Sequence, residues 1–334
     1  MNLNSDVGIV AIGRNEGERL RRCFLSLMDF SSQIVYVDSG STDHSQDIAR
    51  SLSIDVVNLD LSIPFTAARA RNTGLERLLL LNPNIKFVQF VDGDCEVVPT
   101  WLNVAYQQLL AHPEIAVVCG RRREQFPEKS VYNRLCDLEW DTPVGESKYC
   151  GGDAMMRVSA LKQVGGYNAQ LIAGEEPELC VRLRQQGWKI WRIDAEMTLH
   201  DAQMLHFHQW WKRTIRSGYA YAQGAYLHGK PPECHWLKES RRIWLWGLII
   251  PLLSLSLAPF SQGWSLILLV AYLLLTYRII QSQLKRGLSF QEAFVYALFC
   301  VIGKFPQLQG QIQFWLNQFR GKQNPLIEYK LSPN

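Results

Sequence analysis

Residues 87 to 94 read Phe-Val-Gln-Phe-Val-Asp-Gly-Asp, a short apolar run that ends in two carboxylates one residue apart. A run of this length beside a Gly predicts a buried β-strand. In open α/β sheets, ligands bind in the crevice at the carboxyl ends of the strands. Mg²⁺ sites commonly combine one or two carboxylates with the phosphates of a nucleotide, and Mn²⁺ accepts similar ligands. The stretch therefore predicts a strand that delivers Asp92 and Asp94 to a metal and nucleotide site.

On both sides of this strand the sequence repeats one pattern: an apolar strand is followed by a polar turn and then by a helix. Residues 7–12 precede the turn Gly13-Arg14-Asn15-Glu16, and residues 33–37 precede the turn Asp38-Ser-Gly-Ser-Thr-Asp43. By the same patterns we expect strands at 54–59, 115–119 and 189–193, and helices at 44–53, 66–81, 101–112 and 175–186. This alternation predicts an α/β fold whose mostly parallel sheet is covered by helices on both faces.

The composition limits the classes of function. With 334 residues the chain has room for about two domains, and its 47% hydrophobic content supports a sizeable core. The net charge of +4 is mild and the basic residues are scattered, so no nucleic-acid partner is expected. The 8 cysteines include no C-x-x-C pair, which is typical of free thiols in a reducing compartment rather than of a zinc site or a disulfide framework.

The hydropathy of the chain changes abruptly near residue 243. Residues 243–260 and 264–280 are nearly free of charge, and each run approaches the roughly 20 residues that cross a bilayer. We interpret the two runs as a transmembrane helical hairpin, with buried helices of a soluble bundle as the alternative. Basic flanks of such a hairpin stay on the cytoplasmic side of the membrane. The flanking residues are Lys238, Arg241, Arg242, Arg278, Lys285 and Arg286.

Two neighbouring segments are less apolar. Residues 290–305 form a shorter run that contains Glu292 and Lys304, and we interpret it as an interfacial or re-entrant helix. Residues 203–227 are rich in aromatic and basic side chains but poor in Leu and Ile, which fits either an interfacial helix or a lip of the active site. The predicted organisation is a nucleotide-binding catalytic domain at 1–202, an aromatic and basic helical segment at 203–240 and a membrane region at 241–334.

Four polar motifs follow one another along the first two thirds of the chain. They are Val37-Asp38-Ser-Gly-Ser-Thr-Asp43, Ala68-Arg69-Ala-Arg71-Asn72-Thr-Gly74, Asp92-Gly-Asp94 and Gly174-Glu175-Glu176-Pro-Glu178. In this order and spacing the chain resembles the family 2 glycosyltransferases of GT-A fold, across roughly residues 7–213. The resemblance implies a Rossmann-like catalytic domain that transfers a sugar from a nucleotide diphosphate, with inversion at the anomeric carbon.

The resemblance also implies roles for single residues of the donor site, which includes Asp92. Asp38 accepts a hydrogen bond from the nucleobase, and Glu16 lines the nucleoside pocket. Arg71 lies near the diphosphate, which suits a planar and always charged fork of donors, and Asp153 helps to shape the sugar and acceptor pocket. The residues themselves allow simpler alternatives: Asp38 satisfies the backbone of its own turn, and Glu16 is a favourable acid in a first helical turn.

For the chemistry itself, the resemblance implies a Mg²⁺ or Mn²⁺ ion held by Asp92, Asp94 and His200, with Asp94 as the direct ligand. An inverting transfer also needs a general base for the acceptor hydroxyl, and the acidic pair of the family falls on Glu175 and Glu176. Alignment favours Glu176, but the extra methylene of Glu over Asp leaves the choice between the two open. The alternatives are a structural His200 and two glutamates that only stabilise a helix N-terminus.

These expectations combine into one hypothesis, a metal-dependent inverting glycosyltransferase of the inner (cytoplasmic) membrane whose catalytic domain lies in the cytoplasm. Its Trp210-Trp211-Lys212-Arg213 departs from the pattern of processive members, which predicts a non-processive enzyme. The expected partners are a nucleotide-sugar donor, with a UDP-sugar favoured, a lipid-linked or glycan acceptor, and the membrane.

Two alternatives belong to other classes of protein. A nucleotidyltransferase or other nucleotide-binding α/β enzyme of sugar activation would be expected to carry a Gly-rich phosphate loop, and Gly13-Arg14-Asn15-Glu16 does not match one. A non-enzymatic membrane scaffold would retain the fold without needing the motif acids at Asp38, Asp92, Asp94, Glu175 and Glu176, and these acids are present. Both features favour the transferase.

Overall fold

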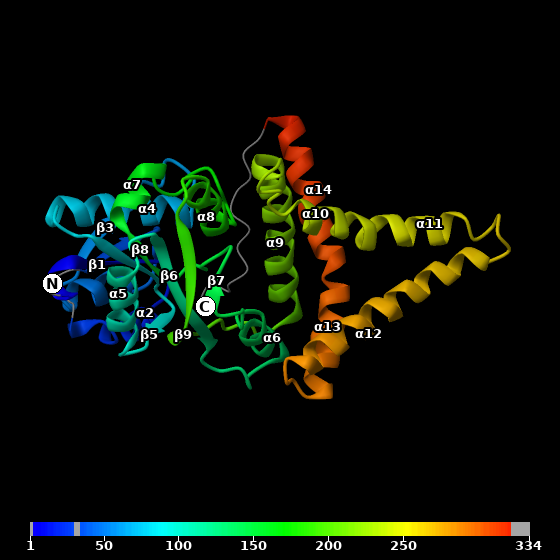
Figure 1. The fold of residues 1–334 in the computed structure, drawn as a ribbon, viewed down its shortest axis with the longest axis horizontal. Helices are drawn as coiled ribbons and strands as arrows, with labels where there is room; N and C mark the ends of the chain where they lie inside the picture. The colour runs from blue at the N-terminus through cyan, green and yellow to red at the C-terminus, as the bar shows by residue number, and fades with distance from the viewer. Residues whose placement is uncertain (1–2, 30–33, 322–334) are drawn as a thin grey trace. The chain divides into compact units, whose positions relative to one another are not determined.

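The computed structural model describes residues 3–29 and 34–321. Within these residues the chain divides into two compact units, with the boundary between His206 and Phe207 (Figure 1). The aromatic and basic segment expected at 203–240 therefore falls mainly in the second unit. Residue 33 of a predicted strand and residues 322–334 of the predicted membrane region lie outside the described residues.

The first unit is built on one mixed β-sheet. Its strands lie in the order β3-β2-β1-β4-β8-β6-β9-β5, and β7 pairs with β9. The strands β3, β2, β1 and β4 are parallel to one another, whereas β8 runs antiparallel to both β4 and β6. The strands are β1 (Val7–Gly13), β2 (Ile34–Asp38), β3 (Asp55–Asn58), β4 (Phe87–Asp92), β5 (Cys95–Val97), β6 (Ile115–Glu124), β7 (Gly145–Glu146), β8 (Ala154–Arg157) and β9 (Lys189–His200).

The register of the central strands brings two predicted site residues to one edge of the sheet. Gly13 at the end of β1 pairs with Asp38 of β2, and Ile12 pairs with Asp92 of β4. Because these strands are parallel, both carboxylates lie at the carboxyl edge, where open α/β sheets bind ligands. The strands β1, β2 and β4 are almost entirely buried, which is why they read as continuous apolar runs.

Helices pack on both faces of this sheet. Consecutive strand residues point to opposite faces, and Tyr36 and Val37 of β2 meet different helices. The ring of Phe24 in α2 lies 5.6 Å from the ring of Tyr36. On the other face, Gly74 of α4 approaches Val37 and Val10 so closely that a Cβ on Gly74 would overlap Val10. The helices are α1 (Leu3–Asp6), α2 (Glu18–Leu25), α3 (Ser45–Ser51), α4 (Ala67–Leu81), α5 (Trp101–Ala111), α6 (Val131–Glu139), α7 (Val158–Val164) and α8 (Glu175–Gln185).

Two strands are longer than the sequence patterns predicted. β6 continues to Glu124 rather than ending at residue 119, and β9 continues to His200 rather than ending at residue 193. The two strands pair in parallel through their polar halves, with register shifts that mark bulges. The prediction was wrong because it ended each strand with its apolar run, whereas backbone pairing continues beneath the polar side chains.

The second unit is helical. Its helices α9 and α14 meet at Gly218 and Gly310, where a Cβ on Gly218 would overlap Gln307 O and one on Gly310 would overlap Ile215 O. The missing side chains therefore allow the two backbones to touch. The elements of this unit are α9 (Phe207–His228), α10 (Leu237–Trp244), a π-helical turn (Leu245–Ile249), α11 (Ile250–Ser256), a 3₁₀-helix (Trp264–Leu269), α12 (Val270–Lys285), α13 (Phe290–Ile302) and α14 (Lys304–Arg320).

The apolar runs differ in detail from the predicted hairpin. The run at 243–260 contains the π-helical turn and leaves helical structure at Ser256, while the run at 264–280 begins as a 3₁₀-helix and continues to Lys285. Among the described residues, one helix is long and apolar enough to cross a bilayer, Trp264–Lys285, with 22 residues and a mean hydropathy of 1.6. The two-span hairpin therefore stays a prediction.

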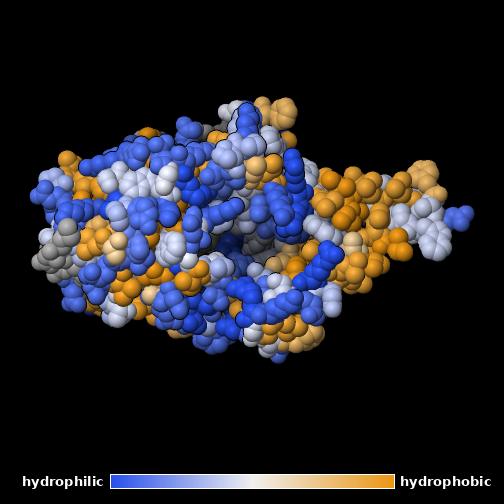
Figure 2. Space-filling view, viewed as in Figure 1, coloured by the Kyte–Doolittle hydropathy of each residue, from blue (hydrophilic) through white to orange (hydrophobic). Residues whose placement is uncertain are grey.

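Large apolar side chains of this region are exposed. Phe260 is 86% exposed, Trp264 is 75% exposed and Leu273 is 69% exposed. Figure 2 shows hydrophobic residues gathered over α11 and α12. Apolar surface of this extent marks an interaction site for a membrane or for another protein.

Candidate active site

Two loops at the carboxyl edge of the sheet are tied together by hydrogen bonds. Asn15 adopts a φ of 55°, in the left-handed region that Asn tolerates, and its Oδ1 accepts from Thr42 N at 2.7 Å. Its backbone N donates to Ser41 Oγ at 2.9 Å, and Glu16 N donates to Ser45 Oγ at 3.1 Å. The first two polar turns of the sequence therefore form one frame.

Asp38 is 1% exposed, and its own turn uses its carboxylate. Oδ2 accepts hydrogen bonds from Gly40 N at 3.0 Å and Ser41 N at 2.8 Å. Gln46 Nε2 donates to the same oxygen at 2.9 Å, and Tyr36 OH donates to Oδ1 at 3.0 Å. These contacts match the alternative in which Asp38 satisfies its own turn. The nucleobase contact implied by the resemblance stays a prediction.

Glu16 is buried beside the same frame. Its Oε2 lies 2.8 Å from Arg19 Nη2, in an ion pair at the start of α2. An acid at this position also interacts favourably with a helix N-terminus, which is the simpler alternative for this residue. Its contact with the nucleoside also stays a prediction.

Arg71 joins the acidic end of β4 to the acidic start of α8. This guanidinium is 2% exposed; Nη2 donates to Asp92 Oδ1 at 2.8 Å, and Nη1 donates to Glu175 Oε1 at 2.8 Å. The planar fork of donors suits two carboxylates at once. Thr66 begins the helix that carries Arg71, because its Oγ1 caps the backbone by accepting from Arg69 N at 3.1 Å.

A second arginine, Arg122 of β6, extends this network. Its Nη2 donates to Asp92 Oδ2 at 3.1 Å, and its Nε donates to Asp153 Oδ2 at 2.9 Å. Asp153 is completely buried and also accepts from Asp92 N at 3.0 Å and from Thr198 Oγ1 at 2.8 Å. Asp153 therefore holds Asp92 and Arg122 in place, and any influence on a sugar or acceptor pocket passes through these neighbours.

Gly152 provides the space in which these charged groups meet. A Cβ at this position would lie 2.8 Å from Arg71 Nη2, 2.9 Å from Asp92 Oδ2 and 3.3 Å from Arg122 Nη2. Atoms this close to a Cβ would have to move, so any side chain would push the guanidiniums away from the carboxylate. The glycine before Asp153 therefore lets these charged groups meet without displacement.

Asp94 lies in a different cluster from Asp92. It is 3% exposed, and its Oδ2 lies 3.1 Å from His200 Nε2. The other nitrogen of the imidazole, Nδ1, lies 3.5 Å from Glu124 Oε2. Glu124 is held by Asn133 Nδ2 at 3.0 Å and by Ala202 N at 3.2 Å. His200 is the last residue of β9, whereas the sequence patterns placed it in a loop after the strand.

The donor atoms of this cluster fit a divalent cation. Ligand atoms of Asp94, Cys95 and His200 all lie within 4.8 Å of one another. Carboxylate oxygens suit Mg²⁺ and Mn²⁺ alike, and the imidazole adds a nitrogen donor. Asp92 is less available, because both of its carboxylate oxygens accept hydrogen bonds from arginines.

The protonation of the same cluster depends on its carboxylates. Burial lowers the pKa of His200, but Asp94 and Glu124 outweigh burial and raise this pKa above its ordinary value. Burial, with nearby carboxylates, raises the pKa of the Cys95 thiol well above its ordinary value. The protonated thiol therefore donates its S–H to Asp94 Oδ1 at 3.7 Å. A bound cation would have to replace the proton on His200 Nε2.

The two glutamates at the start of α8 have different surroundings. Gly174 precedes them with a φ of 77°, which allows the chain to turn sharply into the helix. Glu175 is 5% exposed and is bonded to Arg71. Burial and the Glu175 carboxylate raise the pKa of Glu176 to about 7, although Arg71 opposes the shift. A carboxylate with a pKa near neutrality is suited to accept a proton, which favours Glu176 over its neighbour as the base.

Sequence reasoning missed Arg122 and Glu124. Both lie in the part of β6 beyond residue 119, where the predicted strand ended. Residues two apart in a strand share a face, so the spacing of Arg122 and Glu124 was the signal that could have found them. Their partners Asp153 and His200 lie far along the chain, which no local pattern indicates.

Two protein-family models together match the part of the chain that contains all of these motifs. Residues 9–165 match the family model described as Glycosyl transferase family 2, and residues 136–209 match the model described as N-terminal domain of galactosyltransferase. Residues 9–165 are therefore similar to the glycosyl transferase family 2 domain. The first match includes Asp94, and the second includes Glu176 and His200.

Curated relatives match the first part of the chain. The Pre-mycofactocin glycosyltransferase of Mycobacterium tuberculosis is 27% identical over 213 residues, which are 59% of this chain and 43% of that protein. The Succinoglycan biosynthesis protein ExoA of Rhizobium meliloti is 26% identical over 180 residues, which are 51% of this chain and 54% of that protein. The chain thus spans about half the length of the curated relatives it matches.

A solved structure extends the likeness to the fold of the chain. The mannosyltransferase PcManGT from Pyrobaculum calidifontis, in complex with GDP-Man and Mn²⁺, has a TM-score of 0.61 and 15% identity. The match covers 94% of this chain and 88% of that one. The predicted α/β fold of GT-A type is confirmed.

Proposed function

We propose that this protein is a family 2 glycosyltransferase that transfers a sugar from a nucleotide-diphosphate sugar to an acceptor hydroxyl, with inversion at the anomeric carbon and with a divalent cation. The Arg71 bridge carries the proposal. Its single buried guanidinium contacts both Asp92 at the end of β4 and Glu175 at the start of α8. The donor motif and the base motif therefore border one site, as a displacement reaction requires. The family match over residues 9–165 supports the transfer chemistry.

The general base in this proposal is Glu176. Inversion needs one group that takes the proton of the acceptor hydroxyl as its oxygen attacks the anomeric carbon. With a pKa of about 7, a large share of Glu176 is ionised near neutral pH and can accept that proton. Glu175 stays in its ion pair with Arg71 and keeps the start of α8 against β4.

Asp94 and His200 would hold the cation. When bound, a divalent cation supplies positive charge that stabilises the departing diphosphate. Glu124 lies behind His200 Nδ1 and keeps Nε2 directed at Asp94, which is the orientation that a ligand nitrogen needs. The carboxylate oxygens suit Mg²⁺ and Mn²⁺ alike, so the proposed ion is one of these two.

The acceptor and the location form a second part of the proposal, in which a lipid-linked or glycan acceptor is used at the cytoplasmic face of the inner membrane. The helix Trp264–Lys285 spans about 33 Å at 1.5 Å per residue, enough for the roughly 30 Å hydrocarbon core of a bilayer. The apolar segment from residue 243 would supply the other arm of a hairpin. The exposed Phe260 and the basic Arg286 support this placement, because the first favours hydrocarbon and the second favours the cytoplasm.

The identity of the nucleotide in the donor sugar should be determined first. The sequence favoured a UDP-sugar, whereas the mannosyltransferase with the similar fold was solved with GDP-Man and Mn²⁺. The experiment is a thermal-shift panel of UDP-, GDP- and dTDP-sugars, each with and without Mn²⁺, on the full chain in a neutral detergent. We expect one nucleotide class to raise Tm only with Mn²⁺, by the equivalent of about 2.7 kcal/mol at a hundredfold excess over Kd.

Two variants make this experiment decisive. Asp94→Asn should lose the Mn²⁺-dependent part of the shift, because the isosteric amide carries no charge. The matched control is Asp47→Asn, which changes a carboxylate that is 72% exposed on α3 and should keep the full shift. A panel in which no nucleotide sugar raises Tm would contradict the proposed function.

A further inference from the structure

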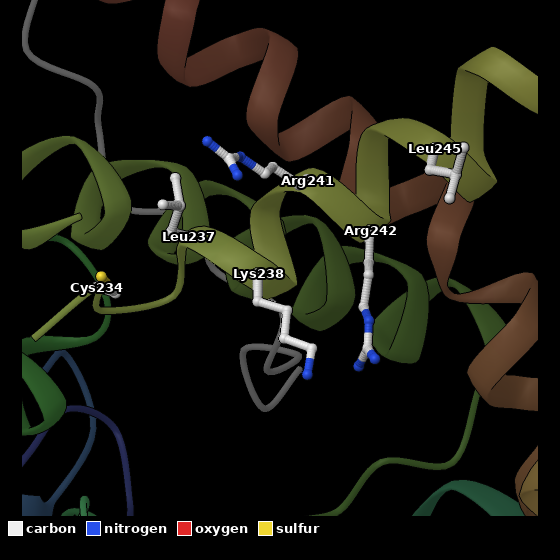
Figure 3. A pocket seen from close by; sticks show the side chains of 6 residues that line it. All are labelled: Cys234, Leu237, Lys238, Arg241, Arg242 and Leu245. Atoms are coloured by element: carbon white, nitrogen blue, oxygen red, sulfur yellow. The ribbon is translucent and has the colours of Figure 1, made fainter. Parts of the chain in front are cut away.

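One face of α10 forms a basic and apolar groove that the proposed chemistry does not use. The groove has a volume of about 280 Å³ (Figure 3). Figure 3 shows Lys238 and Arg242 pointing in the same direction from α10, while Arg241 extends another way. Among residues 3–29 and 34–321, no carboxylate forms an ion pair with any of these three cations. The groove is lined by Cys234, Leu237, Lys238, Arg241, Arg242 and Leu245.

The helix that carries this groove is fixed from its opposite side. Ile243 is 1% exposed, and Ser240 Oγ donates to Gln311 Oε1 of α14 at 3.0 Å. Gly247, in the following π-helical turn, lies so close to α14 that a Cβ there would lie 2.8 Å from Lys304 O. The groove therefore lies on a rigid helix face rather than on a loop.

Along this face the outward side chains change from basic to aliphatic. Lys238 and Arg242 are followed by Leu245, Ile249 and Leu252, at steps of three or four residues. The three aliphatic residues are 40%, 43% and 57% exposed. Residues three and four apart share one side of a helix, so the strip begins with two cations and continues as hydrocarbon. An amphiphile with a negative head and an apolar tail has the same order of groups.

We propose that this strip binds an anionic phospholipid, with the phosphate between Lys238 and Arg242 and an acyl chain along Leu245 and Ile249. The cations select a negative headgroup, because each basic residue close to an anionic membrane surface strengthens binding about fivefold. The aliphatic continuation selects a lipid over a free phosphate ion. This proposal rests on the membrane location given under the proposed function, because its ligand is a component of a bilayer.

The test uses the full chain, purified in a neutral detergent and examined by native mass spectrometry. Equimolar phosphatidylglycerol and phosphatidylcholine with identical acyl chains compete for the protein, and the wild type should retain phosphatidylglycerol. In the double variant Lys238→Gln/Arg242→Gln this affinity should fall about 25-fold, which is about fivefold for each of the two charges removed. The control Lys162→Gln/Lys189→Gln removes two exposed cations of the first unit and should change the affinity less than about twofold.

Three results would overturn the lipid site. They are equal retention of the two lipids by the wild type, equal losses in the two double variants, and retention of soluble glycerol phosphate at concentrations similar to those of phosphatidylglycerol. Flotation with phosphatidylcholine vesicles separates this proposal from the membrane location. A chain that floats but shows no preference for phosphatidylglycerol loses only the lipid site. A chain that floats with no vesicle of either lipid loses the membrane location as well.

Discussion

The two units place their apolar and charged side chains in opposite ways. In the first unit the apolar residues form a buried core, and site charges such as Arg71 and Asp153 are buried with them in paired form. In the second unit large apolar side chains such as Leu273 are exposed, and so are the cations Lys238 and Arg242. Burial from water therefore stabilises the first unit, whereas the second unit carries an apolar surface that water disfavours.

This difference determines which substitutions report on function. Removing one partner of a buried ion pair leaves the other charge buried and typically costs about 3–5 kcal/mol. Variants of the first unit must therefore keep the shape of the side chain, and each needs a measurement of stability beside the measurement of activity. Exposed cations of the second unit can be neutralised with little effect on folding, so their variants report on binding directly.

The largest effect should come from Asp94 in the first unit. We expect Asp94→Asn to lower the initial rate of sugar transfer more than about 10³-fold, because the carboxylate that would hold the cation loses its charge. The measurement is transfer from the donor that the thermal-shift panel identifies. If Asp94→Asn retains transfer within tenfold of the wild type, a metal site at this position is wrong.

The next largest effect should come from Glu176. Glu176→Gln should lower transfer about 10²- to 10³-fold and leave the donor-induced rise in Tm intact, because the base is lost and the donor contacts are not. Glu175→Gln is the comparison, and it should lower Tm because it weakens the buried pair with Arg71. Loss of transfer at an unchanged Tm in Glu175→Gln, with an active Glu176→Gln, would reverse the assignment of the base.

The core of the first unit and its acidic pair could be predicted because their signals are local. The strands β1, β2 and β4 are covered on both faces, so each reads as an apolar run, and each is followed at once by its polar turn. The motif that contains Arg71 came from the family resemblance. Arg71 contacts both Asp92 and Glu175 only in the folded protein. The sequence therefore indicated which residues belong to the site, but it did not indicate these two contacts.

The parts that were missed depend on contacts between distant segments. Glu124 lies beyond the apolar run of β6, and its importance follows from its contact with His200. Helix α14 has many polar residues, and its position depends on the close approach of Gly310 to Ile215 O. Hydropathy located the apolar part of the chain. It does not indicate the π-helical turn at Leu245–Ile249 that interrupts the first apolar run.

A smaller effect is expected from Glu124, which contacts His200 on the side away from Asp94. Glu124→Gln should weaken Mn²⁺ binding about 10- to 100-fold, because the carboxylate that orients His200 is replaced by an amide. Titration of the full chain with Mn²⁺, followed by electron paramagnetic resonance, measures this affinity directly. The control is Glu196→Gln, which changes a carboxylate that is 53% exposed on β9 and should leave the affinity unchanged. Equal affinities in Glu124→Gln and the wild type would remove Glu124 from the site.

The pH dependence of the first unit should show the pKa of Glu176. The base must be ionised, so kcat/KM should rise about tenfold per pH unit below pH 7 and level off above it. Stability should change in the opposite direction. The folded-state pKa is raised from 4.5 to about 7, so the stabilisation present below pH 4.5 is lost as the pH rises through 7. Glu176→Gln should therefore gain Tm relative to the wild type at pH 8 but not at pH 4. An equal difference in Tm at both pH values would show that this pKa is not raised.

The smallest effect on catalysis should come from the packing of the second unit. Gly310→Ala puts a methyl group where Ile215 O lies, and overpacking of this kind typically costs about 1–3 kcal/mol. We expect a lower Tm for the helical unit and transfer within about twofold of the wild type in detergent, because the residues of the active site all lie before residue 207. Arg320→Gln, at the exposed end of α14, is the control and should change neither quantity. If Gly310→Ala lowers transfer as strongly as Glu176→Gln, the two units are energetically coupled. The contrast between a catalytic unit stabilised by its buried core and a second unit that acts independently of it would then not hold.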